Sequence, residues 1–378
     1  MRIAIVAPYF GVRGGREQTV YELARGLAER GHFVKVFTTD RTPSGGRADH
    51  KKGEGFEVER IRSLFVAFRL EVPLRLPKLS HFDIVHVIST DDVFTFLFAI
   101  AAKISRKPVV ATAFTPFALL KHPRRFLRPF MAFIELISLI SIAISDVVHV
   151  KNDIDFELVR RVKRGVVVVP DGVPRYYFDL KPRLDFRRKY GLVGKRIILF
   201  VNRIHPLKGP QLLVEAMPEI LRAYPNALAV FIGPDAGYVE ELKRLAMKKG
   251  VQDSVLFLGF VSEEEKIAAY DAADVVVIPS IGEFTEAFSI VLSEAWARGK
   301  TVVVSESRAL RSRVKGHGYI FGDYDAKNLA EAVKEALKSP KKAPKVHSWD
   351  EVVEMMEKIY ENLFPLQTQK EDYDASQE

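Results

Sequence analysis

Short runs of β-branched and apolar residues alternate with helix-like segments along the whole chain, and this alternation strongly limits the fold. Clear examples are 2–6 (RIAIV), 33–39 (FVKVFTT), 196–202 (RIILFVN) and 274–280 (DVVVIPS). Continuous apolar strands joined by helices are typical of parallel sheets that are covered on both faces. Two such series predict an α/β chain with two doubly wound, Rossmann-like parallel-sheet domains and a cleft between them. The other expected strands are 57–61, 83–88, 108–112, 146–150, 165–170, 227–233, 254–259 and 301–305.

Polar, proline-containing segments mark the expected domain boundaries. The sequence predicts a first domain at 1–178, a linker at 179–195 and a second domain at 196–345. A last helix is expected at 346–364, and the polar residues 365–378 are expected to be disordered.

Composition excludes several classes of site. The chain has 378 residues, 48% of them hydrophobic, which is enough for two cores. It has no cysteine, so disulfides, thiolate catalysis and cysteine-ligated zinc are excluded. The lack of cysteine and the many Lys, Arg and Glu residues favour a thermophile. The apolar segment 130–145 is too short to span a membrane and contains Glu135, so we expect a cytoplasmic protein without transmembrane helices.

Positive charge is concentrated in the first half. Residues 1–178 contain 28 Lys and Arg against 18 Asp and Glu, whereas the remainder contains 29 against 30. This asymmetry predicts an anionic partner for the first half: an acidic substrate, a membrane surface or nucleic acid. Nucleic acid is the least favoured of these, because no basic motif with interleaved aromatic residues is present.

A glycine pair precedes the first helical pattern. Gly14 and Gly15 follow the first expected strand, and such glycines let backbone N–H groups approach a phosphate at a helix N-terminus. Their spacing is not the dinucleotide fingerprint G-x-G-x-x-G, so NAD is not inferred. The alternative is an ordinary tight turn.

Two cations follow the strand at 196–202. Arg203 and Lys208 lie on one loop, where a planar guanidinium and a compact ammonium could clamp a diphosphate. The alternative is a pair of solvated surface charges.

Two glutamates, Glu286 and Glu294, are separated by seven residues after the strand at 274–280. Carboxylates accept hydrogen bonds from vicinal hydroxyls, as on a ribose or a hexose. A helix is expected to begin near Phe288 or Ser289. The alternatives are a helix-dipole partner for Glu286 and a salt-bridged residue for Glu294. The N–H groups expected to hold an anion are those of Ala287, Phe288, Ser289 and Ile290.

Together, a glycine loop, a diphosphate clamp and two hydroxyl-binding carboxylates predict a site for a nucleotide-diphosphate sugar. From Ile3 to about residue 340, the chain resembles the retaining glycosyltransferases of family 4 (glycosyl transferases group 1), which have the GT-B fold. The resemblance rests on RGGREQTVYELARGLAERGHFVKVFTT, VVPDGV, the NR…KG loop, VLFLGFVSEEE and the Glu–seven–Glu motif.

The resemblance implies a role for each matching position. Arg203 and Lys208 would neutralise the leaving diphosphate, Glu286 would bind the transferred sugar, and Glu294 the ribose. It also implies donor contacts from Gly15, from the amides around Phe288 and Ser289, and from the backbone of Phe260 and Val261 near the base.

The resemblance further implies a retaining, metal-independent hexosyltransferase without a resident cofactor. The donor would be a UDP- or GDP-sugar, and the acceptor a sugar, a glycan or a lipid-linked molecule. The final helix would cross back to the first domain. The alternatives are a nucleotide-sugar-binding protein without transfer activity, and an epimerase or hydrolase of the same fold.

The chain departs from the family pattern at a few positions. Phe114 stands where a histidine is usual, which removes a polar sugar contact. Ala287, Ser289 and Asn202 stand where glycines are common. The Asp-x-Asp pairs at 153–155 and 323–325 are expected to cap helices, and His86 is expected to pack near the cleft floor. Neither the Asp-x-Asp pairs nor His86 are expected to bind metal.

A basic cluster precedes the apolar segment 130–145. One interpretation is a surface that docks on anionic lipid and presents a lipid-linked acceptor, with the enzyme peripheral on the inner membrane face. The other is a core helix that follows an exposed loop. The cluster residues expected on this surface are Lys121, Arg124, Arg125 and Arg128.

Overall fold

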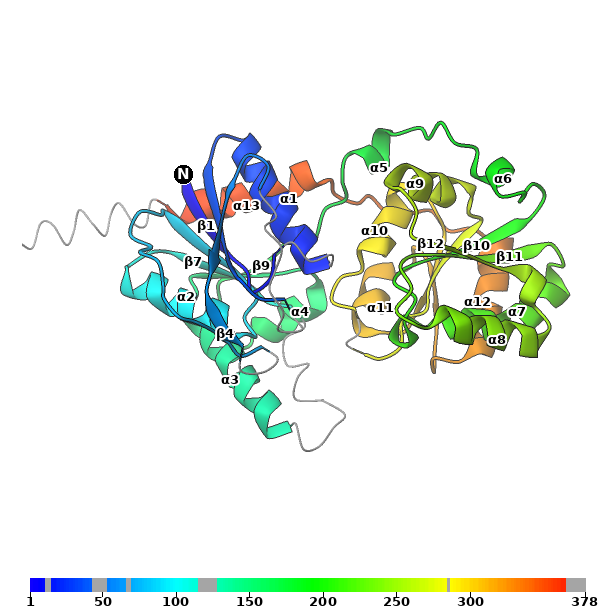
Figure 1. Ribbon diagram of the computed structural model, residues 1–378, viewed down its shortest axis with the longest axis horizontal. Helices are drawn as coiled ribbons and strands as arrows, with labels where there is room; N and C mark the ends of the chain where they lie inside the picture. The colour runs from blue at the N-terminus through cyan, green and yellow to red at the C-terminus, as the bar shows by residue number, and fades with distance from the viewer. Residues whose placement is uncertain (11–14, 43–52, 66–68, 115–127, 284–285, 365–378) are drawn as a thin grey trace, which may run out of the picture. The chain divides into compact units, whose positions relative to one another are not determined.

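The computed structural model describes residues 1–10, 15–42, 53–65, 69–114, 128–283 and 286–364. The chain forms two compact units, Met1–Asp171 with Trp349–Glu378, and Gly172–Ser348 (Figure 1). The chain therefore leaves the first unit at Asp171 rather than at residue 178, and the expected linker 179–195 lies inside the second unit. The physical reason is burial, because Phe186 and Leu192 of that segment pack into the second core.

The first unit is built on a seven-stranded parallel sheet of order β3-β2-β1-β6-β7-β8-β9. A short antiparallel hairpin, β4 and β5, accompanies it. The strands are β1 Arg2–Val6, β2 Phe33–Thr39, β3 Glu57–Ile61, β4 Ser63–Phe65, β5 Glu71–Pro73, β6 Ile84–Ile88, β7 Val109–Thr112, β8 Val147–Val150 and β9 Val166–Val168. The helices are α1 Gly15–Glu29, α2 Val93–Ile104, α3 Arg128–Ile144, α4 Asp153–Val159 and α13 Trp349–Leu363.

The second unit has a six-stranded parallel sheet of order β12-β11-β10-β13-β14-β15. The strands are β10 Arg196–Val201, β11 Ala227–Ile232, β12 Val255–Gly259, β13 Val275–Ile278, β14 Val302–Ser305 and β15 Tyr319–Phe321. The helices are α5 Tyr176–Asp179, α6 Phe186–Lys189, α7 Pro210–Ala223, α8 Val239–Lys249, α9 Glu263–Ala272, α10 Ile290–Ala297, α11 Arg308–Val314 and α12 Ala326–Lys338.

Each run that the sequence marked as a strand lies in one of these two parallel sheets, which confirms the predicted fold class. The sequence missed β4, β5 and β15, which have three residues each and are too short to show a period. None of the helices in the described ranges is long and apolar enough to cross a membrane.

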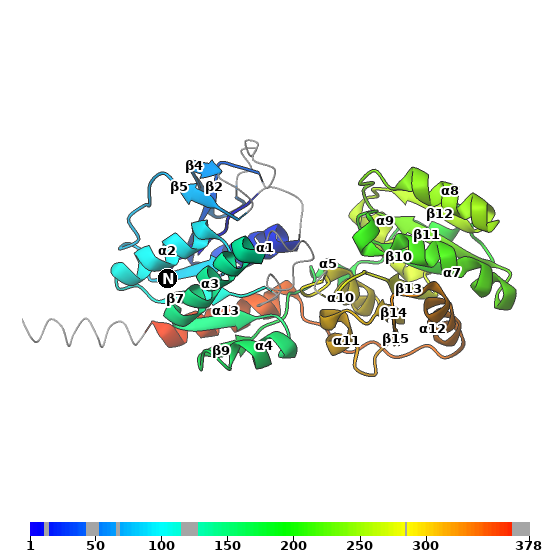
Figure 2. The ribbon, with the colours of Figure 1, turned by 90° about the horizontal axis from the view of Figure 1, so that it is seen from below.

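Helix α13 packs on the first sheet although it follows the whole second unit in sequence (Figure 2). Successive side chains of β6 point to opposite faces of the sheet, and this alternation explains the position of α13. Val85 and Val87 join one hydrophobic cluster with Phe94 and Phe98 of α2. His86 faces the other way, and its Nδ1 lies 2.6 Å from the hydroxyl of Tyr360 in α13. His86, which was expected near the cleft floor, is thus buried against the C-terminal helix and anchors it.

A buried hydrogen-bond chain continues from His86 across the sheet. Its Nε2 lies 2.8 Å from Thr112 Oγ1, which lies 3.0 Å from His149 Nδ1. His149 Nε2 then lies 2.7 Å from the carbonyl oxygen of Val169. Burial lowers the pKa of His149 from 6.5 to about 4. Burial, followed by the neighbouring His149 and Lys151, lowers the pKa of His86 as well.

The buried histidines of this hydrogen-bond chain predict that the free energy of unfolding falls in acid. The unfolded state takes up the histidine proton near pH 6.5 and the folded state only near pH 4, so the stabilisation is complete above pH 6.5 and is lost as the pH falls toward 4. For His149 the difference amounts to about 3 kcal/mol. Urea unfolding across this range should show a flatter pH dependence for His149→Gln than for the wild type. The exposed control His81→Gln should keep the wild-type slope.

Candidate functional site

The candidate site lies where the strand order of the second sheet reverses. Strands β10 and β13 are hydrogen-bonded neighbours, and the chain moves outward in opposite directions from them. Ligands of doubly wound sheets bind at such a switch point, outside the carboxyl ends of the strands. The loop with Arg203 and Lys208 follows β10, and the loop with Glu286 follows β13. Topology thus brings two of the three predicted stretches to one sheet edge.

A glycine fixes the loop that carries Lys208. Lys208 ends a 3-10 turn, Pro206–Lys208, and Gly209 follows with φ 69°. A Cβ at Gly209 would collide with the carbonyl oxygen of Pro279, which follows β13. The amide of Ile281 also donates to the carbonyl oxygen of Leu207 at 2.9 Å. Only glycine allows this approach, which holds the Lys208 loop against the end of β13.

Lys208 and Glu286 form an ion pair. Lys208 Nζ lies 2.7 Å from Glu286 Oε1, and the side chains are 16% and 9% exposed. Ser280 Oγ, after β13, donates to the same oxygen at 2.7 Å. The pair connects the cation predicted for the leaving group with the carboxylate predicted for the sugar. Both positions were predicted from sequence; Ser280 was missed, because a lone serine after a strand is not distinctive.

The helix between the glutamates begins slightly later than predicted. Helix α10 starts at Ile290, so Glu286 lies in the loop before the helix and Glu294 lies in the second turn of the helix. Ser289 is the N-cap residue, with φ 64° and ψ 92°. Glycine is favoured in this region, so the serine that replaces the usual glycine carries backbone strain. The N–H groups of Phe288, Ser289 and Ile290 have no acceptor among the described residues.

Arg313 of α11 holds this turn in place. Its Nη1 donates to the carbonyl oxygens of Phe288 and Ser289 at 2.5 and 2.9 Å, and its Nη2 donates to Ser293 Oγ at 2.8 Å. Its guanidinium carbon also lies 3.6 Å from the centroid of the Phe288 ring. Arg313 therefore binds the carbonyl oxygens of this turn and not its N–H groups. Arg313 could not be recognised from the sequence, since arginines near helix ends are common.

The second glutamate lies in a separate polar cluster. Tyr270 donates its hydroxyl to Glu294 Oε2 at 2.8 Å, and Lys266 Nζ lies 3.2 Å from Glu294 Oε1. Glu294 is 5% exposed, and burial together with this carboxylate raises the pKa of Tyr270 well above 10. Lys266 also pairs with Glu263 at 3.1 Å. Glu294 is therefore salt-bridged in the structure, as the alternative interpretation expected. Its contact with a ribose stays a prediction.

The remaining predicted donor contacts are more exposed or lie elsewhere. The side chain of Arg203 is exposed and has no ion-pair partner among the described residues. Phe260, directly after β12, is 65% exposed, and Val261 is 9% exposed. Gly15 is the first residue of α1 in the first unit. Gly14, Lys121, Arg124 and Arg125 lie outside the described residues, whereas Arg128 is the exposed first residue of α3.

The two Asp-x-Asp motifs lie at the starts of helices α4 and α12. Asp325 caps α12 by accepting from the amides of Lys327 and Asn328. Asn152, rather than an aspartate, caps α4, and Asp153 and Asp155 lie in the first turn of that helix. Within the described part of the chain, no three His, Cys, Asp or Glu side chains gather into a group that could hold a metal ion.

In the first unit, Phe114 lies between two cations. The ring, which is 5% exposed, has the Arg16 guanidinium carbon 4.5 Å and Lys151 Nζ 4.3 Å from its centroid. Lys151 is buried and lies 2.6 Å from Asp171 Oδ2. Arg16 lies 3.7 Å from Asp91 Oδ1. The phenylalanine that replaces the expected histidine therefore packs against charged groups at the carboxyl ends of β6, β7 and β8.

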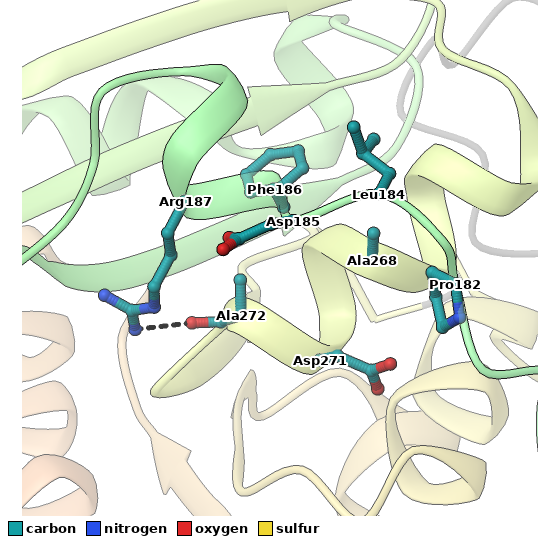
Figure 3. Close-up of a pocket in the computed structure, with 8 residues that line it drawn as sticks. All are labelled: Pro182, Leu184, Asp185, Phe186, Arg187, Ala268, Asp271 and Ala272. Atoms are coloured by element: carbon teal, nitrogen blue, oxygen red, sulfur yellow. Dashed lines mark hydrogen bonds between the residues drawn. The ribbon is translucent and has the colours of Figure 1, made fainter.

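One pocket of about 340 Å³ in the second unit contains none of the predicted site residues. It lies between residues 182–187 and α9 (Figure 3). Arg187 donates to the carbonyl oxygen of Ala272 at 2.7 Å, as the dashed line shows, and Asp271 is paired with Arg298 at 2.6 Å. These polar groups already have partners, so the pocket is a packing groove where the segment docks.

Comparison with known proteins decides the family. The model for Glycosyltransferase Family 4 matches residues 13–177, and the model for Glycosyl transferases group 1 matches residues 182–352. A phosphatidyl-myo-inositol mannosyltransferase of Mycobacterium tuberculosis is 30% identical over 336 residues, which cover 84% of this chain and 82% of that protein. The chain is a group 1 glycosyltransferase. This confirms the predicted family and the predicted enzyme class.

Other similar proteins agree with this assignment. An uncharacterized glycosyltransferase of Methanocaldococcus jannaschii is 29% identical over 343 residues, covering 83% of each chain. Sucrose-phosphate synthase from Thermosynechococcus elongatus has a TM-score of 0.73 at 20% identity and covers 97% of this chain and 100% of that one. HepE of Anabaena in complex with UDP has a TM-score of 0.70 at 18% identity over 100% of both chains. The structural neighbours show that this glycosyltransferase has the GT-B fold.

The Arg313 contacts predict a donor-affinity effect. Arg313→Lys keeps the charge but loses the planar fork that reaches two carbonyls and a hydroxyl at once. We expect the donor KM to rise about tenfold, since hydrogen bonds of a charged group contribute about 1.5–3 kcal/mol. Steady-state kinetics with varied donor measures this effect. Arg311→Lys, an exposed site on the same helix, is the matched control. An unchanged KM in Arg313→Lys would show that the contacts of Arg313 do not shape the donor site.

Proposed function

We propose that this glycosyltransferase moves a hexose from a nucleotide-diphosphate sugar to a sugar, glycan or lipid-linked acceptor. Transfer retains the configuration of the sugar and needs no metal ion. The observation that carries the proposal is the Lys208–Glu286 ion pair at the switch point, beside the N–H groups of Phe288, Ser289 and Ile290, for which the described residues supply no acceptor. A cation, a carboxylate and helix N-terminal amides match a sugar joined to a diphosphate.

The residues divide the work by charge. Arg203 and Lys208, with the amides of Phe288, Ser289 and Ile290, stabilise the negative charge that develops on the leaving diphosphate. In a metal-dependent enzyme, a divalent cation would stabilise this charge. Glu286 binds hydroxyls of the transferred sugar. The acceptor hydroxyl attacks the sugar on the face that the diphosphate leaves, through an oxocarbenium-like state. The bond from the sugar to the diphosphate breaks as the new bond forms, and the hydroxyl proton passes to the departing diphosphate oxygen.

Glu294 binds the ribose hydroxyls, and the backbone of Phe260 and Val261 lies near the base. UDP and GDP are the favoured donor nucleotides. The solved structures of HepE with UDP and with UDP-glucose support a nucleotide sugar of this kind. The name of the mannosyltransferase relative places its acceptor among phosphatidylinositol lipids, which supports a lipid-linked acceptor here. We accordingly place the enzyme in the cytoplasm, peripheral on the inner membrane face.

Thermal stabilisation by UDP, GDP and ADP in the presence of EDTA tests the donor site. A nucleotide at a hundred times its Kd should raise the free energy of unfolding by about 2.7 kcal/mol. Glu294→Gln should reduce this gain, because a neutral amide is a poorer acceptor for two ribose hydroxyls. The control is Glu240→Gln, an exposed carboxylate on α8. Stabilisation by none of the three nucleotides, with or without Mg²⁺, would contradict the proposed donor site.

A further inference from the structure

Helix α3 of the first unit is apolar on two opposite faces. Its inner face is buried in the unit and includes Ile134 at 0%, Ile137 at 5% and Ile142 at 1% exposure. Its outer face exposes Phe133 at 52% and Leu136 at 53%. An ordinary surface helix exposes polar side chains opposite its buried face, so α3 departs from the usual amphipathic pattern.

The exposed positions form one continuous stripe. They recur at three- and four-residue spacing, which places them on the same side of the helix. Over 17 residues the helix is about 25 Å long. The outer stripe consists of Pro129, Ala132, Phe133, Leu136, Ile140 and Ala143, all exposed.

Cations flank this stripe and anions are missing from it. Arg128 is exposed at the N-terminal end. At the other end, Lys163 Nζ donates to the carbonyl oxygen of Ala143 at 3.1 Å. Glu135 is the only acidic residue of α3, and it is 4% exposed and belongs to the inner face. An apolar centre with positive ends is complementary to the interface of an anionic bilayer, where acyl chains meet negative headgroups.

We propose that the outer stripe of α3 docks the enzyme on an anionic membrane surface. The helix lies in the plane of the interface, with Phe133, Leu136 and Ile140 among the acyl chains and the flanking cations at the headgroups. Docking of this kind would bring a lipid-linked acceptor to the enzyme, and only this consequence rests on the proposed function. The docking itself depends on the surface of α3 and not on the donor site.

Co-sedimentation with vesicles of equal parts phosphatidylcholine and phosphatidylglycerol tests the proposal at low salt. The wild type should bind, and the variant Phe133→Gln, Leu136→Gln, Ile140→Gln should bind at least tenfold more weakly. These side chains are exposed, so the melting temperature should not fall. The matched control is Val193→Gln, Met247→Gln, Ile320→Gln, three exposed apolar sites of the second unit that are 70%, 64% and 46% exposed. The control should bind like the wild type.

Three outcomes would overturn the proposal: no vesicle binding by the wild type, equal binding by the stripe variant, or equal binding to pure phosphatidylcholine. Sedimentation velocity tests whether a second copy of the chain, rather than a membrane, covers the stripe. If the wild type dimerises, the stripe variant is monomeric and neither binds vesicles, then a second copy of the chain covers the stripe. Nucleotide-induced thermal stabilisation of the stripe variant is a separate readout, so a failed donor site is not confused with failed docking.

Discussion

Glu286→Gln is expected to reduce kcat for sugar transfer about a hundredfold or more, the size of effect seen when one preorganised group is removed from a reacting centre. The substitution preserves shape and removes the charge that Lys208 Nζ and Ser280 Oγ contact at 2.7 Å each. A neutral amide accepts weaker hydrogen bonds from the sugar hydroxyls and no longer balances the lysine. The measurement is release of the nucleoside diphosphate from UDP-glucose and GDP-mannose in the presence of mixed sugar and lipid acceptors.

The control for this prediction is Glu283→Gln, an exposed carboxylate of the same loop, which should retain wild-type turnover. Nucleotide-induced stabilisation should persist in Glu286→Gln, because the ribose and phosphate contacts remain. A double-mutant cycle with Lys208→Met measures the coupling of the pair. Turnover by Glu286→Gln within threefold of the wild type would remove Glu286 from the reacting centre.

Asp171→Asn is expected to destabilise the first unit by about 3–5 kcal/mol, the range for breaking a buried ion pair by removing one partner. Lys151 is buried, and its Nζ lies 2.6 Å from Asp171 Oδ2 and 3.0 Å from Thr19 Oγ1. Burial already lowers the pKa of Lys151, although Asp171 raises it in part. Without the carboxylate, the folded state must hold an uncompensated ammonium or release its proton. Urea unfolding measures the loss.

The pH dependence separates this mechanism from a simple packing defect. The unfolded lysine keeps its proton up to about pH 10.4, whereas the folded lysine of Asp171→Asn releases it earlier. The loss of stability should therefore shrink as the pH rises. Adding Lys151→Met should recover part of the stability. Glu354→Gln is the control, because its pair with Lys358 is 2.6 Å long but exposed to solvent, so its loss should leave the unfolding curve close to that of the wild type.

Much of the fold could be predicted from the sequence because its parallel strands are buried on both faces. Such strands are nearly continuous apolar runs, as at residues 197–201 of β10 and in β13, and they are easily recognised in the sequence. Three-residue strands such as β15 contain too little pattern. The end of the first unit was placed too late, because polar residues suggested a linker where Phe186 and Leu192 are buried in the second core.

The candidate site was predictable where a residue type carries its own chemistry. Lys208 and Glu286 were found because a cation or a carboxylate at a strand end is unusual enough to note. Arg313, Ser280 and Tyr270 were missed because their role comes from where their side chains end, on carbonyls or carboxylates distant in sequence. The sequence shows that Ser289 stands where glycine is common, but only its φ of 64° in the structure shows that the serine backbone is strained there.

The sequence by itself determined the two parallel sheets, the family and the positions of the charged residues, because these depend on local periodicity and on spaced motifs. Tertiary structure alone decided which of these residues meet. It pairs Lys208 with Glu286 through the glycine contact of two neighbouring loops, and it places Phe114 between Arg16 and Lys151. It also shows which sides of the apolar segment 130–145 are covered, whereas docking on lipid stays a proposal. That segment is both a core helix and an exposed apolar surface, because a helix has two sides and a hydropathy pattern does not tell which of them the rest of the chain covers.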